Sequence, residues 1–164
     1  MRRLKNILLV YPEIPRNTYW SFEYSLRFIN RSAALPPLGL ITIAALVPDR
    51  FHLKLVDMNI EPLKPVDLDW ADAVFVSAMI IQKDSLQDVA RMCRKAGTPV
   101  VAGGPYPTAS HEEIEGVDHF VLGEAEAVLP DFLADFENKT AGRIYRAKQK
   151  PDITHSVVPR FDLL

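Results

Sequence analysis

The sequence predicts an α/β fold, in which a mainly parallel β-sheet is covered by helices on both faces. Three observations indicate this class. Segments typical of strands alternate with segments typical of helices along the 164 residues. Most strand segments, such as Ile7 to Val10, are apolar at every position, which is typical of strands buried on both faces. Hydrophobic residues make up 48% of the chain, so it can build one sizeable core.

The first predicted strand, Asn6 to Tyr11, leads into a long aromatic segment. Pro12 is expected to end the strand. Residues 12–36 are expected to be irregular, and a loop of this length usually has a function or contacts a partner. Its aromatic residues are Tyr19, Trp20, Phe22, Tyr24 and Phe28.

A buried helix and a second strand follow. A helix is predicted over Leu38 to Val47, with Pro37 near its first position. Because Thr42 is its one polar residue, the helix is expected to be buried on most of its surface. Alternating residues predict a strand at His52 to Asp57. Residues 58–72 contain two prolines and little helical periodicity, so a short, poorly formed crossover is expected there.

Two further strands, Ala73 to Ala78 and Pro99 to Gly103, enclose the clearest helix. This helix, Asp84 to Ala96, is expected to be capped by Asp84 or Ser85 at its start. Its apolar residues share one face: Leu86, Val89, Ala90 and Cys93.

The last elements complete a five-stranded sheet. Asp118 to Leu122 is the fifth strand, residues 125–136 form an amphipathic helix that begins with acidic residues, and Arg143 to Arg146 is a possible extra edge strand. Five such strands predict the flavodoxin-like order 2-1-3-4-5, a Rossmann-like three-layer sandwich over residues 1–147. Residues 148–164 are polar and interrupted by prolines, and we expect a linker toward a further domain.

Composition excludes several classes of function. The net charge of −2 gives no basic excess for nucleic acid. No window approaches the ~20 apolar residues of a membrane span, and Ile7 to Val10 is too short for a signal peptide, so a cytoplasmic protein is expected. The lone Cys93 excludes an internal disulfide or a cluster bound by several thiolates of this chain. None of the four histidines pairs with another at a metal-ligand spacing.

A ligand of such a sheet binds at the carboxyl ends of the strands, at the switch point between strands 1 and 3. Residues 11–39, 77–81 and 103–107 are expected to converge there. Gly103-Gly104 either allows close approach of a bulky group or only makes a tight turn. Ser77 is either a ligand donor or a satisfied hydroxyl at a strand end. Glu124 and Glu126 either bind a ligand or complement a helix dipole.

Taken in order, several short runs resemble one family. They are Ile7-Leu-Leu-Val-Tyr-Pro12, Pro36-Pro-Leu-Gly-Leu40, Leu55-Val-Asp-Met-Asn59, Ser77-Ala-Met79, Val100-Val-Ala-Gly-Gly-Pro-Tyr-Pro107 and Leu122-Gly-Glu-Ala-Glu126. Together they resemble the N-terminal cobalamin (B12)-binding domain of B12-dependent radical S-adenosylmethionine enzymes, of methyltransferase or cyclase type. The resemblance covers nearly the whole chain.

The resemblance implies which residues bind the cofactor. Ser77 would bond the dimethylbenzimidazole tail, Met79 would line its pocket, and Gly103 with Gly104 would let the tail approach. The full set that the resemblance implies is Tyr11, Pro12, Glu13, Leu38, Gly39, Asp57, Ser77, Met79, Ile80, Gly103, Gly104, Pro105, Tyr106, Gly123 and Glu124.

Two departures from related patterns sharpen the prediction. Many B12 domains carry Asp-x-His-x-x-Gly after strand 1, whose histidine binds cobalt from below, but residues 12–36 contain no histidine. A state without a histidine lower ligand is therefore expected. The Cys-x-x-x-Cys-x-x-Cys of the radical domain is also missing, so the 4Fe-4S cluster and S-adenosylmethionine would belong either to a C-terminal radical domain in cis, which the resemblance implies, or to a partner protein in trans.

Two other kinds of protein remain as alternatives. A non-catalytic receiver-like or protein-interaction domain could share the fold, but a receiver needs an acidic cluster after strand 1 and an aspartate after strand 3, where Ser77-Ala-Met79 stands. A flavin binder would need a Ser/Thr-rich phosphate loop in residues 12–17, which hold a proline-bound stretch instead.

Overall fold

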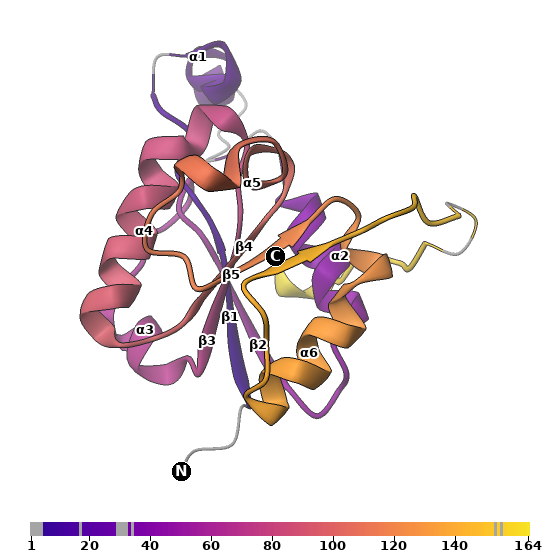
Figure 1. Cartoon of the computed structure of the whole chain (residues 1–164). Helices are drawn as coiled ribbons and strands as arrows, with labels where there is room; N and C mark the ends of the chain where they lie inside the picture. Colours follow the sequence, from indigo (N-terminus) through magenta and orange to yellow (C-terminus); the bar gives the residue numbers. More distant parts are fainter. Residues whose placement is uncertain (1–4, 17, 29–32, 34, 153, 155) are drawn as a thin grey trace.

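The computed structural model describes residues 5–16, 18–28, 33, 35–152, 154 and 156–164. They form three layers, with one sheet between two layers of helices (Figure 1). The six strands are parallel and lie in the order β2-β1-β3-β4-β5-β6. They are β1 Asn6–Tyr11, β2 His52–Asp57, β3 Ala73–Ser77, β4 Val100–Gly103, β5 His119–Leu122 and β6 Ile144–Arg146.

The predicted order is confirmed for the first five strands, and the predicted count of five is wrong by one. The possible edge strand at residues 143–146 is present as β6, which pairs in parallel with β5. The bounds of β1 and β2 are those expected from the sequence. The sheet is therefore wider by one strand at its β5 edge, away from the switch point between β1 and β3.

Helices cover both faces of the sheet. Helices α3, α4 and α5 pack on one face, and α2 and α6 pack on the other (Figure 1). The short helix α1 lies beyond the carboxyl ends of the strands. The helices are α1 Glu23–Phe28, α2 Leu38–Leu46, α3 Pro65–Trp70, α4 Lys83–Ala96, α5 Pro105–Ser110 and α6 Leu129–Asn138.

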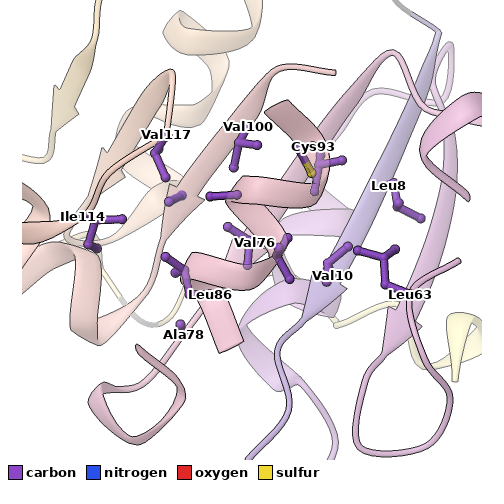
Figure 2. Close-up of a cluster of buried hydrophobic side chains, with 14 of the residues drawn as sticks. Leu8, Val10, Leu63, Val76, Ala78, Leu86, Cys93, Val100, Ile114 and Val117 are labelled. Atoms are coloured by element: carbon purple, nitrogen blue, oxygen red, sulfur yellow. The ribbon is translucent and has the colours of Figure 1, made fainter. Parts of the chain in front are cut away.

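Alternate residues of β1 belong to two separate cores. Leu8 and Val10 face α3 and α4, whereas Ile7 and Leu9 face α2 and α6, and all four side chains are fully buried. The expectation that this strand is covered on both faces is confirmed. Figure 2 shows the first core, which α4 completes with the residues predicted for its buried face: Leu86, Val89, Ala90 and Cys93.

The single cysteine is chemically inactive inside this core. The Cys93 side chain is fully buried. Burial, assisted by the negative charge of Asp118, raises the pKa of its thiol to about 12. A thiol with this pKa stays protonated at neutral pH, so Cys93 is neither a nucleophile nor a metal ligand in the folded chain.

The structure corrects the expected start of α4. The helix begins at Lys83, directly after a 3-10 turn at Ile80–Gln82, and its N-cap position is Gln82. Asp84 and Ser85 lie inside the helix and do not cap it. The Ser85 hydroxyl instead accepts a hydrogen bond of 2.9 Å from the backbone N–H of Glu13.

Two other expected boundaries are also corrected. Residues 12–36 are not wholly irregular, because they contain a 3-10 turn at Tyr19–Ser21 as well as α1. Residues 17, 29–32 and 34 of that segment lie outside the described residues. The helix expected over residues 125–136 begins as a 3-10 turn at Ala125–Ala127, and α6 follows from Leu129.

The C-terminal tail packs back on the domain, which its polar sequence did not predict. The backbone N–H of Arg160 donates to the carbonyl of Ile41 in α2, at 2.9 Å. Leu163, in a 3-10 turn at Phe161–Leu163, packs against the core between the sheet and α2. Helix α2 is thus held by the sheet on one side and by the tail on another.

The crossover between β2 and β3 is short, as expected, but its helix α3 is well capped. The Asp67 side chain is 4% exposed and accepts the backbone N–H of Lys64 at 2.9 Å. Its other oxygen pairs with Nζ of Lys54 at 2.7 Å. Burial acts to raise the pKa of Asp67, but the bonds from Lys54 and Lys64 outweigh it and hold this pKa below its usual value.

Replacing Asp67 with asparagine is expected to destabilise the fold in a pH-dependent way. A hydrogen bond to a buried charge contributes about 1.5–3 kcal/mol, so the variant should lose about that much unfolding free energy at neutral pH. Because the folded pKa is lowered, this stabilisation is present above the unfolded pKa of about 3.9 and is lost as the pH falls through the folded pKa. Urea unfolding followed by circular dichroism across that range measures the difference. Exposed Asp69 of the same helix provides the control, since Asp69→Asn should have little effect.

Candidate functional site

A cavity of about 460 Å³ opens at the carboxyl ends of β3, β4 and β5. Its deep part lies between the sheet and helices α2 and α6, and apolar side chains form its walls there, among them Phe75, Val101, Val121 and Leu129. Polar groups stand nearer the strand ends: Ser77, Thr108, Glu124 and Glu126. This volume and this combination of apolar walls with a few polar groups are typical of small-molecule sites.

The glycine pair after β4, Gly103-Gly104, lets neighbouring segments of the chain approach closely at the cavity. A Cβ on Gly103 would lie 2.9 Å from the carbonyl oxygen of Val121. Gly104 has φ +91°, and a Cβ there would lie 2.5 Å from Oγ of Ser77 and 3.2 Å from the backbone nitrogen of Ala78. The tight-turn interpretation is thus sufficient to require both glycines, and the same closeness brings the backbone to the cavity wall.

Thr108 ties two sides of the cavity together, and sequence reasoning missed it. Its hydroxyl accepts the backbone N–H of Gly123 at 3.0 Å, which joins α5 to the turn after β5. Gly123 has φ +80°, so this turn requires a left-handed residue at the point of attachment. Its position in the sequence could have indicated its place at the site, because Thr108 stands four residues after Gly104, on the helix that begins after the glycine pair.

A second group of polar residues lies at the ends of β1 and β2, outside the cavity lining. Asp57 is 7% exposed, and its carboxylate accepts the backbone N–H and the side-chain amide of Asn59, at 2.9 and 2.7 Å. Oδ1 of Asn59 in turn accepts the N–H of Ile14 at 2.8 Å. These bonds fix the loop after β1 against the loop after β2. Sequence reasoning named Asp57 but not Asn59.

Tyr11 lies within this second group. Burial, followed by the negative charge of Asp57, raises the pKa of its phenol above the usual value, against the effect of a hydrogen bond with Gln82. The phenol is therefore a neutral hydrogen-bonding group at physiological pH. At the end of β1 it provides an aromatic ring and a neutral hydroxyl group.

The structure divides the predicted site residues into two groups. Those that line the cavity are Leu38, Gly39, Ser77, Gly103, Gly104, Pro105, Gly123 and Glu124. Those that do not line it are Tyr11, Pro12, Glu13, Asp57, Met79, Ile80 and Tyr106. Tyr106 is 6% exposed and packs in the core beneath α4, on the other side of the sheet. Ile80 is 62% exposed in the turn that precedes α4.

Within the described ranges, no group of three or more histidine, cysteine, aspartate or glutamate side chains could hold a metal ion. In the same part of the chain, no helix is long and apolar enough to cross a membrane. Nδ1 of His119 lies within hydrogen-bonding distance, 2.7 Å, of the carbonyl oxygen of Gly142. The ring of His111 packs against the ring of Phe120. His155 lies outside the described residues.

Comparison with known families shows the family to which the chain belongs. The B12 binding domain family matches residues 24–133 of the chain. The chain belongs to this family. As a B12-binding domain it has the cofactor that the sequence resemblance implied, cobalamin, and this favours the resemblance over the receiver-like and flavin alternatives.

Three curated proteins are similar to this B12-binding domain. An uncharacterized methyltransferase of Synechocystis sp. is 40% identical over 159 residues, 96% of this chain. Hopanoid C-2 methylase of Rhodopseudomonas palustris is 30% identical over 164 residues, 97% of this chain. Bacteriochlorophyllide d C-8(2)-methyltransferase of Chlorobaculum tepidum is 30% identical over 117 residues, 71% of this chain. The chain spans only 30%, 31% and 25% of these relatives, respectively.

Proposed function

We propose that the chain binds cobalamin at the carboxyl edge of its sheet, with the nucleotide tail in the cavity beside Ser77 and Gly104. The observation that carries this proposal is the cavity itself. It opens beside the switch point of a parallel sheet, its deep walls are apolar, and eight of the fifteen predicted residues line it. An apolar slot of this volume fits a flat aromatic base, and the Ser77 hydroxyl can donate to a base nitrogen.

The corrin ring is proposed to rest on the loops that follow β1 and β3. These loops carry Pro12, Glu13 and Met79, which the structure places outside the cavity but at the same edge of the sheet. When bound, cobalamin supplies a cobalt centre that can carry a methyl group. The residues of this chain hold and orient the cofactor, and their carbonyls and hydroxyls set its position.

We further propose that the lower face of cobalt receives no histidine from this chain. No histidine follows β1 in residues 12–36. His52 begins β2 and His119 begins β5, so both stand at the amino ends of strands, opposite the proposed site. His111 packs against Phe120, a core residue of β5.

The whole protein is proposed to be a B12-dependent radical S-adenosylmethionine methyltransferase. Its similar proteins are named as methylases or methyltransferases, which favours methyl transfer over cyclisation. The 4Fe-4S cluster and S-adenosylmethionine would belong to a radical domain in cis, because Cys93, the one cysteine here, is buried in the core. Sequencing the gene beyond residue 164 tests this directly. A downstream Cys-x-x-x-Cys-x-x-Cys supports the proposal, and its absence contradicts it.

The radical domain is proposed to pack on an exposed aromatic surface formed by Tyr19, Trp20, Phe22, Tyr24 and Phe28. These side chains are 81%, 48%, 37%, 73% and 94% exposed, respectively. So many exposed aromatic rings in ten residues are typical of a surface that another protein covers. The relatives are about three times as long as this chain, as their coverage shows, so such a covering domain is available in proteins of this length.

Trp20 provides a direct measurement of that contact. In a Trp70→Phe background, Trp20 is the only tryptophan among these 164 residues. In the full-length protein, with any further tryptophans replaced, we expect weaker quenching of Trp20 fluorescence by acrylamide than in the 164-residue chain. Equal quenching in the two proteins would show that the surface stays open and would contradict this contact.

Cobalamin binding is tested by incubating the chain with hydroxocobalamin, desalting it and recording the visible spectrum. We expect corrinoid to be retained at about one per chain, by the 164-residue chain or by the full-length protein. A folded protein that retains none in either form would contradict the proposal. A bound spectrum typical of histidine-ligated cobalt would contradict the lower-face proposal alone.

A further inference from the structure

Gln82 is the most completely buried polar side chain among the described residues, and no feature of the cavity requires it. Its side chain is fully buried, whereas the other buried polar residues, Asp57, Asp67 and Thr98, are 7%, 4% and 9% exposed. A buried amide is stable only when its polar atoms are hydrogen-bonded. The partners of Gln82 therefore show what its burial achieves.

Those partners belong to two different loops at the switch point. Nε2 of Gln82 donates to the carbonyl of Pro12 at 2.6 Å, and Oε1 accepts the backbone N–H of Met79 at 2.9 Å. The Tyr11 phenol is also near this side chain, which acts to lower the pKa of the phenol. Pro12 follows β1 and Met79 follows β3, and these two strands are neighbours. One side chain thus joins the two loops.

The two loops diverge, which is why a bridge between them matters. After β1 the chain leads to α2 on one face of the sheet, and after β3 it leads to α4 on the other face. Divergence of this kind creates the crevice in which ligands of open α/β sheets bind. Pro12 has no N–H of its own, so its carbonyl is the one backbone group through which Gln82 can hold it.

We propose that Gln82 is a positioning residue that fixes the spacing of the two loops on which the corrin ring rests. This inference depends on the proposed function for the existence of the bound cofactor. Gln82 itself is not assigned a contact with cobalamin. It acts through Pro12 and Met79, and an apolar side chain of similar size would fill its space without holding either loop.

The first experiment compares Gln82→Leu with Val89→Ala. Val89 is a fully buried residue of α4, the helix that Gln82 precedes, and it makes neither of the two loop bonds, so it controls for a general loss of stability. We expect Gln82→Leu to speed hydrogen exchange of the backbone amides around residues 13–14 and 79–81 in the cofactor-free protein. We expect its affinity for cobalamin to fall by about 10-fold, equivalent to about 1.4 kcal/mol. Val89→Ala should change neither the local exchange nor the affinity.

The second experiment uses Gln82→Glu, whose protonation state decides whether it can donate. A neutral carboxyl group can donate to the Pro12 carbonyl and accept from Met79, whereas an ionised one can only accept. Tyr11, on which the negative charge of Asp57 acts, is a titratable neighbour of this side chain, and the charged residues Glu13 and Lys83 directly follow Pro12 and Gln82. We expect cobalamin affinity, relative to wild type at each pH, to recover at about pH 5 and to be lost at about pH 8. Gln82→Leu should show no such recovery.

The outcomes separate this inference from the function on which it depends. If wild type and Gln82→Leu bind cobalamin equally well and show equal exchange in the two loops, the inference is overturned and the proposed function stands. If Gln82→Glu shows no pH-dependent recovery, the bridging role is overturned as well. If the wild-type protein binds no cobalamin in any form, the proposed function fails and this inference fails with it.

Discussion

Replacing Gly104 with alanine is expected to abolish tight retention of cobalamin and to destabilise the fold. A Cβ at this position would lie 2.5 Å from Oγ of Ser77 and 3.2 Å from the nitrogen of Ala78, in a backbone with φ +91°. With ψ −174° this backbone lies in a region that essentially only glycine adopts, and it costs another residue about 1–3 kcal/mol. Overpacking adds about 1–3 kcal/mol. Relief of the clash must displace Ser77 or open the strand ends, and both changes distort the cavity.

Gly97→Ala is the matched control for this substitution. Gly97 also has a positive φ, +73°, but a Cβ there would meet no atom within 4 Å. This residue ends α4, away from the cavity lining. The control should therefore lose stability through backbone strain alone and keep its affinity for cobalamin. Thermal unfolding and spectral titration with hydroxocobalamin measure both quantities. Unchanged cobalamin affinity in Gly104→Ala would show that the cavity beside Ser77 is not the cofactor site.

Replacing Gly39 with leucine is expected to remove cobalamin binding while leaving the fold intact. Gly39 lies in the first turn of α2 and lines the cavity, where a Cβ would be 3.8 Å from Oγ of Ser77. No strain is expected, and the higher helix propensity of leucine favours the helix by as much as about 1 kcal/mol. The added side chain would occupy the part of the cavity in which the nucleotide tail is proposed to bind. We expect the affinity to fall by about 100-fold, equivalent to about 2.7 kcal/mol.

Gly142→Leu makes the same chemical change at a site remote from the cavity. Gly142 precedes β6, and the nearest atom to a Cβ there is Cε2 of Tyr145, 4.0 Å away. This control should bind cobalamin like the wild-type chain. Isothermal titration, together with unfolding curves for each variant, gives affinity and stability separately. A Gly39→Leu chain that is folded and still binds cobalamin tightly would place the nucleotide tail outside this cavity.

The sequence was most informative where burial is decided locally. A run of consecutive apolar residues such as Ile7 to Val10 has no stable arrangement except a strand covered on both faces, and its structure follows from that. The glycine pair at residues 103–104 could likewise be located, because two glycines at a strand end require a special backbone or a close neighbour. These features need only the residues themselves and their position along the chain.

The sequence was least informative where a residue's role depends on a distant partner. Gln82 resembles an ordinary polar residue near the start of a helix, and its burial depends on the Pro12 carbonyl, 70 positions earlier. The family resemblance implies that Tyr106, which follows the glycine pair, belongs to the site together with Pro105. Successive residues of a helix point about 100° apart, however, so Pro105 lines the cavity while Tyr106 enters the opposite core.

The anchoring of the tail on α2 determines where a longer polypeptide would leave this domain. The bond between Arg160 and Ile41, with Leu163 packed on the core, places the last residues beside the helix that forms one wall of the cavity. A domain joined there by a short tether would be present at a high effective concentration over the cavity, about millimolar for a short flexible connection. Weak intrinsic affinity between the two domains would then be enough to close the site, and opening could remain fast.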